Sequence, residues 1–243
     1  MPPEVHALLF DTYGTVVDWR PAVLAALVEV GRARGLTVDW EQVLADWEPR
    51  PIQDRVNAGA LPWMTMEQIH RRAATEALAR HGVTDLSPED LDRLVHVRWA
   101  LPPWPDSVPG LTRLKRRYVI SPLSNASFAG MVRLAKFAGL PWDCIITAEN
   151  ARRYKPAPEV YRTAVALLGL PAGQVMLVAA QLRSARRAER GLAHRVRAAT
   201  HRVRAGPDHR PGAGGGVGRG GARLRRPGRE ARRLSAALSP RSA

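Results

Sequence analysis

The sequence predicts an α/β protein: a parallel β-sheet with helices on its faces and a helical segment inserted after the first strand. Three observations predict this class. Short apolar runs typical of buried strands alternate with amphipathic helical patterns in the second part of the chain. Residues 21–99 contain helical patterns and no convincing strand. Beyond residue 181 the apolar pattern ends, so the sheet and its helices are expected before that point.

Four apolar runs are predicted to be strands. The first, residues 5–10, stops at Asp11 and is followed by Gly14, which indicates a buried strand that ends in a tight turn. The other three cover residues 118–123, 143–147 and 174–179. Pro122 lies in the second run, and because proline has no N–H to donate to a ladder, we expect it at a strand end rather than a strand centre.

Helical patterns lie between these runs, over residues 108–117, 128–138 and 158–168. This alternation predicts a Rossmann-like parallel sheet, with a core domain formed by residues 1–18 and 100–181. We expect residues 19–99 to form a helical cap domain. Its helices are predicted over residues 22–34, 40–47, 66–81 and 87–99, the last one starting with Ser87 as N-cap and Pro88 in the first helical position.

The formal net charge of +15 is concentrated at one end of the chain. Residues 182–243 hold 17 arginines, no lysine and three acidic residues, so they carry +14 and the rest of the chain +1. All 14 aromatic residues precede this segment, which contains ten glycines and four prolines. Since such a composition buries too little apolar surface to offset the entropy of ordering, we predict a mostly disordered basic tail, with a helix near residues 184–192.

No feature of the sequence indicates export, an oxidising compartment or a membrane. Cys144 is the single cysteine and cannot form an intrachain disulfide, so nothing calls for an oxidising environment. The N-terminal segment lacks the pattern of a signal peptide, and no apolar run approaches the ~18 residues of a membrane-spanning helix. We therefore expect a cytoplasmic protein without a membrane partner.

Polar residues follow the predicted strands at the edge where parallel sheets gather functional groups. Asp11 follows the first strand and is placed to act as a nucleophile, and Lys155 could hold it oriented. Ser124 and Asn125 follow the second strand and precede a helix, where hydroxyl and N–H groups bind anions. Each position alone also has a structural interpretation: Asp11 as a turn cap, Ser124 and Asn125 in an ordinary N-cap, Lys155 as a solvated lysine.

Together these segments resemble the haloacid dehalogenase superfamily over residues 5–180. The similar motifs are Phe10-Asp11-Thr12-Tyr13-Gly14-Thr15, Leu123-Ser124-Asn125 and Tyr154-Lys155-Pro156. Most members of the superfamily are magnesium phosphatases with a second aspartate where this chain has Tyr13, which argues against phosphatase chemistry. The pattern Asp-x-Tyr-Gly-Thr resembles the metal-independent L-2-haloacid dehalogenase branch, as does Trp104-Pro105-Asp106-Ser107-Val108-Pro109-Gly110 at the return from the cap.

The resemblance implies a covalent mechanism that needs no metal and no cofactor. Asp11 would displace halide from C2 of an L-2-haloalkanoate with inversion, and water would hydrolyse the resulting aspartyl ester. Thr15 and Lys155 would position the carboxylate. The implied substrate-binding residues are Tyr13 as a pocket wall, Ser124 and Asn125 at the substrate carboxylate, and Tyr161, which is equally explained as a packed helix residue. The resemblance also implies a homodimer.

This chain departs from the family pattern in the cap. The family places a halide-binding arginine directly after a cap tryptophan, but Trp47 is followed by Glu48, so Arg50 is the substitute candidate.

The second departure concerns the fourth motif, which should supply an aspartate near position 184, where this chain has Ser184. Because composition changes abruptly near Gln181, we interpret the tail as the product of a shifted reading frame and expect weak or no activity. Reading the underlying DNA in the other two frames tests this interpretation.

Two other functions stay open. The Arg-rich tail could bind nucleic acid through phosphate contacts, although no lysine, aromatic residue or RGG repeat interleaves its arginines, which disfavours this partner. A phosphatase of the same superfamily is the other alternative.

Overall fold

The computed structural model describes residues 4–180, so the predicted tail at 182–243, its helix near 184–192 and Ser184 lie outside the described residues. Within residues 4–180 the strands form one parallel sheet in the order β3-β2-β1-β4. The strands are β1 (Ala7–Phe10), β2 (Val119–Ser124), β3 (Ile146–Thr147) and β4 (Val175–Val178). The predicted α/β class is confirmed.

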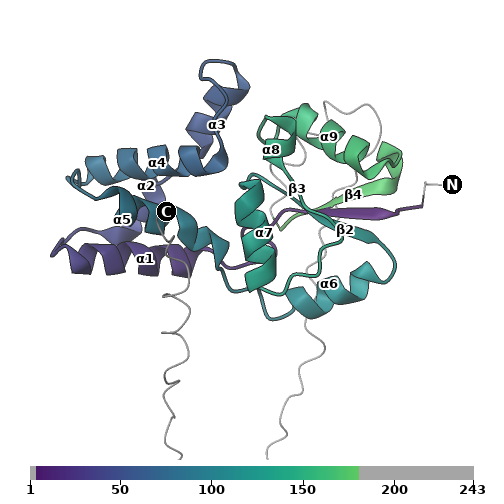
Figure 1. Ribbon diagram of the computed structural model, residues 1–243, viewed down its shortest axis with the longest axis horizontal. Helices are drawn as coiled ribbons and strands as arrows, with labels where there is room; N and C mark the ends of the chain where they lie inside the picture. The colour runs from purple at the N-terminus through teal and green to yellow at the C-terminus, as the bar shows by residue number, and fades with distance from the viewer. Residues whose placement is uncertain (1–3, 181–243) are drawn as a thin grey trace, which may run out of the picture. The chain divides into compact units, whose positions relative to one another are not determined.

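Alternation of side chains along β1 gives the sheet two apolar faces. Leu8 and Phe10 pack on one face with buried residues of α6 (Ser107–Lys115) and α7 (Phe128–Phe137). Ala7 and Leu9 belong to the second buried cluster, which includes residues of α8 (Ala148–Ala151) and α9 (Pro158–Leu168). Figure 1 shows α6 and α9 on opposite sides of the sheet. A short 3₁₀ turn, η2 (Ala172–Gln174), leads into β4.

Pro122 lies inside β2, opposite Phe10, and not at a strand end as expected. The N–H of Ile120 donates to the carboxylate of Asp143, on the side of β2 where β3 continues. Because alternate residues of a strand face the same side, the nitrogen of Pro122 also faces that side. β3 pairs with β2 only at Leu123 and Ser124. The proline is tolerated because the ladder on that side begins after it.

Five α-helices lie between β1 and α6, separate in Figure 1 from the helices beside the sheet. They are α1 (Arg20–Ala33), α2 (Trp40–Asp46), α3 (Arg50–Asn57), α4 (Met66–Arg80) and α5 (Pro88–His96), which continues into the 3₁₀ turn η1 (Val97–Trp99). The helical insertion is therefore observed, whereas the domain boundaries remain predictions. No helix within residues 4–180 is long and apolar enough to cross a membrane.

The prediction missed α3. Pro49 and Pro51 interrupt the helical pattern there, but proline is tolerated in a first helical turn because the N–H groups of that turn have no intrahelical partner. The predicted start of α5 is confirmed, since the hydroxyl of Ser87 accepts the N–H of Asp90 at 3.2 Å. Asp90 also forms an ion pair with Arg34, the residue that follows α1, and this pair ties the two helices together.

Candidate active site

The turn after β1 fixes the backbone of Asp11. Its N–H donates to the carbonyl of Val178 on β4 at 2.9 Å. The carbonyl of Thr12 then accepts the N–H of Val16 at 2.8 Å, which closes the turn. Gly14 within it has a φ of +81°, a left-handed conformation that glycine adopts without strain. The strand register and this turn place Asp11 at the carboxyl edge of the sheet.

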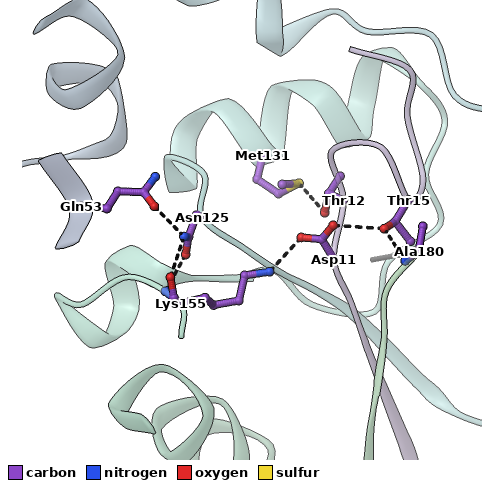
Figure 2. A network of polar contacts seen from close by, with 8 residues as sticks. All are labelled: Asp11, Thr12, Thr15, Gln53, Asn125, Met131, Lys155 and Ala180. Carbon is purple, nitrogen blue, oxygen red and sulfur yellow. Dashed lines mark hydrogen bonds and ion pairs between the residues drawn. The ribbon is translucent and has the colours of Figure 1, made fainter. Parts of the chain in front are cut away.

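Both carboxylate oxygens of Asp11 have partners (Figure 2). The ammonium of Lys155 donates to Oδ1 at 2.8 Å, and the hydroxyl of Thr15 donates to Oδ2 at 3.0 Å. The N–H of Ala180 donates in turn to the Thr15 hydroxyl at 3.0 Å. The side chains of Lys155 and Asp11 are only 16% and 31% exposed, so water screens this ion pair less than a surface pair. The three predicted residues are thus brought together around one oriented carboxylate.

Asn125 holds the backbone of Lys155 at both of its polar groups. The N–H of Lys155 donates to Oδ1 at 2.8 Å, and Nδ2 donates to the Lys155 carbonyl at 3.2 Å. Nδ2 donates its other hydrogen to Gln53 of α3 at 3.0 Å (Figure 2). Both amide hydrogens of Asn125 are therefore used within the protein. The contacts of this residue position the lysine, although the resemblance implied a contact with the substrate carboxylate.

Asn57, at the end of α3, holds the preceding residue in the same way. The N–H of Tyr154 donates to its Oδ1 at 2.9 Å, and its Nδ2 donates to the Tyr154 carbonyl at 2.8 Å. The Tyr154 hydroxyl donates to the carbonyl of Met64 at 2.6 Å, and its ring stacks on Trp63. No local pattern pointed to Asn57 or Gln53, because α3 itself was not predicted.

Two tyrosines lie within electrostatic reach of Asp11. Burial raises the pKa of Tyr13 to about 12, with a further increase from the negative charges of Glu67 and Asp11 and a partial decrease from Arg98. Burial and the charge of Asp11 raise the pKa of Tyr161, on α9, to about 12. Both hydroxyls therefore keep their proton at neutral pH and can donate it. Ser124 is buried at the end of β2, next to Asn125.

Arg50 is not brought to this group. It lies in the first turn of α3 with its side chain half exposed, and its Nε is 3.8 Å from a carboxylate oxygen of Asp54 on the same helix. The prediction that Arg50 replaces the missing cap arginine is therefore not supported. The physical reason is the start of α3 at this residue, which directs the side chain along the exposed helix surface.

A different arginine, which the sequence reasoning missed, is buried near Tyr13. Arg98 lies in η1 and is 7% exposed, with its guanidinium carbon 4.2 Å from the centre of the Trp47 ring. Burial lowers the pKa of Arg98 to about 10, which still leaves it charged at neutral pH. An arginine in a helical pattern is ordinarily exposed, so a single sequence carries no signal of this burial.

Residues 4–180 do not bring a set of metal ligands together. No three His, Cys, Asp or Glu side chains gather there in a metal-binding arrangement. The expectation of a metal-independent reaction continues to rest on the resemblance of the first motif.

A parallel sheet with a lysine-paired aspartate at its carboxyl edge is typical of α/β enzymes, which gather functional groups at the carboxyl ends of their strands. Comparison with known proteins identifies the family. Residues 5–179 match the haloacid dehalogenase-like hydrolases, and the chain belongs to this family.

The similar proteins are named for two different activities. The chain is 28% identical over 183 residues to (S)-2-haloacid dehalogenase 4A of Burkholderia cepacia, covering 73% of this chain and 76% of the relative. It is 30% identical over 174 residues to hexitol phosphatase A of Escherichia coli (strain K12), covering 70% and 72%. The crystal structure of a defluorinating L-2-haloacid dehalogenase is 38% identical, with a TM-score of 0.73 and coverage of 78% of this chain and 82% of that one.

Proposed function

We propose that this protein hydrolyses L-2-haloalkanoic acids to 2-hydroxy acids through an ester on Asp11. The observation that carries the proposal is the carboxylate of Asp11, held at one oxygen by Lys155 and at the other by Thr15. Relatives named as 2-haloacid dehalogenases support the substrate class. Tyr13 stands where a phosphatase would need a second acid, and its raised pKa makes it a poor proton donor to a leaving group.

In the first step, a carboxylate oxygen of Asp11 attacks C2 of the substrate. A C–O bond forms, and the halide leaves with the electron pair of the C–X bond. The ion pair with Lys155 and the hydrogen bond from Thr15 fix the orientation of the attacking group before the substrate arrives, which lowers the entropic cost of the reaction. The protonated hydroxyls of Tyr13 and Tyr161 and the hydroxyl of Ser124 are then available to the substrate.

In the second step, water attacks the ester and releases the hydroxy acid and a proton, which restores the Asp11 carboxylate. The resemblance implies an acid near position 184 for this step, whereas the chain has Ser184. We therefore propose that hydrolysis is slow and that the ester accumulates. Mass spectrometry of protein incubated with L-2-chloropropionate should show a carboxyethyl group on the peptide containing Asp11.

Chloride release from L-2-chloropropionate tests the function directly. Loss of chloride release in an Asp11→Asn variant, with the D-enantiomer inert toward the original protein, is the expected outcome. Chloride release that persists in Asp11→Asn would show that another group does the chemistry. A variant that restores an aspartate at position 184 and a native-like C-terminus should turn over faster; equal turnover would contradict the proposed impairment.

A superfamily phosphatase is the second candidate, favoured by the 30% identity to hexitol phosphatase A. Magnesium-dependent release of phosphate from a sugar phosphate, without chloride release from 2-chloropropionate, would support it. We expect no such phosphate release, because Tyr13 replaces the acid that would protonate the departing alcohol.

A further inference from the structure

Arg98 is a buried positive charge without a carboxylate partner among residues 4–180. A guanidinium has five N–H donors, yet its hydrogen bonding in the described part of the chain is limited to the Leu94 carbonyl, at 3.2 Å. The ring of Trp47 lies against one face of the guanidinium, in a cation–π contact that leaves the in-plane N–H groups free to donate. Because burial of a charge is costly unless the charge is paired, an anionic ligand would stabilise Arg98 in this position.

Arg98 lines a small cavity that also contains other polar groups. Its lining includes Tyr13, Glu67, His70, Trp99 and Ser127. Nδ1 of His70 is buried and has no hydrogen-bond partner among the described residues. A charged donor and an unsatisfied imidazole nitrogen therefore belong to one cavity.

The protonation states around this cavity favour a bound anion. Burial and the nearby charge of Arg98 lower the pKa of His70 well below its ordinary value, so the ring is neutral and can offer one N–H. The raised pKa of Tyr13 keeps its hydroxyl proton. The carboxylate of Glu67 already accepts the Ser127 hydroxyl at 2.8 Å and has no ion pair with Arg98. An anion would consequently avoid Glu67 and lie nearer to Arg98, Tyr13 and His70.

We infer that Arg98, with Tyr13 and His70, forms a subsite for a compact monoanion. The role of this subsite in turnover rests on the proposed function. Tyr13 links the two groups, because it lines the cavity of Arg98 and its pKa is affected by the charges of both Arg98 and Asp11. A small 2-haloacid attacked by Asp11 presents two such groups, the leaving halide and the carboxylate. Arg98 supplies the positive charge that Glu48 cannot provide and that Arg50 does not bring to the site.

Equilibrium binding of chloride to the full chain tests this subsite without any turnover. Broadening of the chloride NMR line would be measured at constant ionic strength and then titrated with bromide or acetate. Arg98→Gln should weaken chloride binding by about tenfold or more, the effect of losing a charged hydrogen bond. Arg133→Gln is the matched control, because Arg133 also lies over a tryptophan ring, Trp99, but is exposed. The control should change affinity by less than about twofold.

The competing anions distinguish the two sources. Displacement of chloride by bromide alone assigns the subsite to the leaving halide, and displacement by acetate assigns it to the carboxylate; either result, when it depends on Arg98, supports the inference. Absence of chloride binding, or binding that is unchanged in Arg98→Gln, overturns it. If Arg98→Gln does not fold, Tyr13→Phe and His70→Asn replace it, and unchanged chloride affinity in both variants overturns the inference.

The result separates this inference from the proposed function. Arg98-dependent chloride binding without chloride release from 2-chloropropionate would refute the dehalogenase and keep the subsite. Chloride release without Arg98-dependent binding would keep the dehalogenase and refute the subsite.

Discussion

Two cations among residues 4–180, the partly buried Lys155 and the buried Arg98, differ in what neutralises them. Lys155, at the carboxyl edge of the sheet, has its counter-ion within the chain, since its ammonium is 2.8 Å from the carboxylate of Asp11. Arg98, in the helical segment, has an aromatic ring beneath it and no carboxylate partner among residues 4–180. A paired charge orients its partner, whereas an unpaired one costs stability until an anion arrives. In the proposed function the first cation prepares the nucleophile, and in the proposed subsite the second receives an anion.

The support behind each cation differs in kind as well. Asn125 and Asn57 hold the backbone of Lys155 and of Tyr154 through two hydrogen bonds each. Arg98 depends on packing: its neighbour Trp47 is fixed by donation of Nε1–H to the carbonyl of His70 at 2.9 Å. Gly130 of α7 adds to this packing, because a Cβ there would lie 2.6 Å from the indole nitrogen of Trp99.

The largest expected effect follows removal of the nucleophile. Asp11→Asn keeps the shape of the side chain but removes its negative charge, so ester formation should fall by about four orders of magnitude or more. Single-turnover measurement of the ester with L-2-chloropropionate checks this without dependence on the hydrolysis step. An ester found on any other residue of the variant would show that Asp11 is not the nucleophile, and Lys155 would then lose its proposed role of preparing it.

Removal of the paired cation should have the next largest effect. Lys155→Met leaves Asp11 without its ion pair and without a fixed orientation, and we expect about a hundredfold to thousandfold slower ester formation. Lys136→Met, which removes an exposed lysine of α7, serves as the control and should leave the rate unchanged. Equal rates for the two variants would show that Lys155 is not needed.

A smaller effect is expected from the asparagine in α3. Asn57→Ala leaves the N–H and carbonyl of Tyr154 without partners and should lower the free energy of unfolding by about 2 kcal/mol. If Asn57 positions Lys155 through Tyr154, ester formation should also slow about tenfold, in kcat rather than KM. Urea unfolding and single-turnover kinetics check both. Gln42→Ala, which removes an exposed hydrogen bond to Asp46, should change neither; a stability loss in Asn57→Ala with full kcat would leave Asn57 a purely structural role.

The smallest effect concerns pH and the cavity of the unpaired cation. His70 has a pKa well below 6.5 in the folded state, so below pH 6.5 the unfolded chain binds a proton that the folded chain excludes. The free energy of unfolding should therefore decrease as pH falls below that value, by at most about 1.4 kcal/mol per pH unit from this group. His96 contributes with the same sign, because its pKa is also lowered.

A variant isolates the contribution of His70. Urea unfolding between pH 7.5 and 5 should show a shallower decrease for His70→Leu than for the original protein, by up to about one proton. His6→Gln changes an exposed histidine and should reproduce the original slope. Identical slopes for His70→Leu and the original protein would mean that the imidazole is not kept neutral in the cavity.

Particular elements show where sequence reasoning succeeded and where it failed. The strand before Asp11 was predictable because it is a fully buried apolar run that ends in a polar residue and a glycine turn. Helix α3 was not predictable, because Pro49 and Pro51 interrupt the helical pattern of the sequence, whereas they lie at the start of this helix. Pro122 was expected at a strand end because its tolerance inside β2 depends on where β3 starts to pair, which is a tertiary property.

The sequence by itself determined the α/β class and which polar side chains stand at the strand ends. Short sequence segments suffice for these predictions. A few residues show that an apolar run ends at Asp11, and a few others show that Lys155 precedes a helix. Only the tertiary structure decided which groups meet. Lys155 contacts Asp11 across 144 positions of sequence, and Asn57 contacts Tyr154 across 97. The guanidinium of Arg98 lies over the ring of Trp47, the residue that follows α2. Burial and long-range contact arise from packing of distant segments, and no local pattern encodes them.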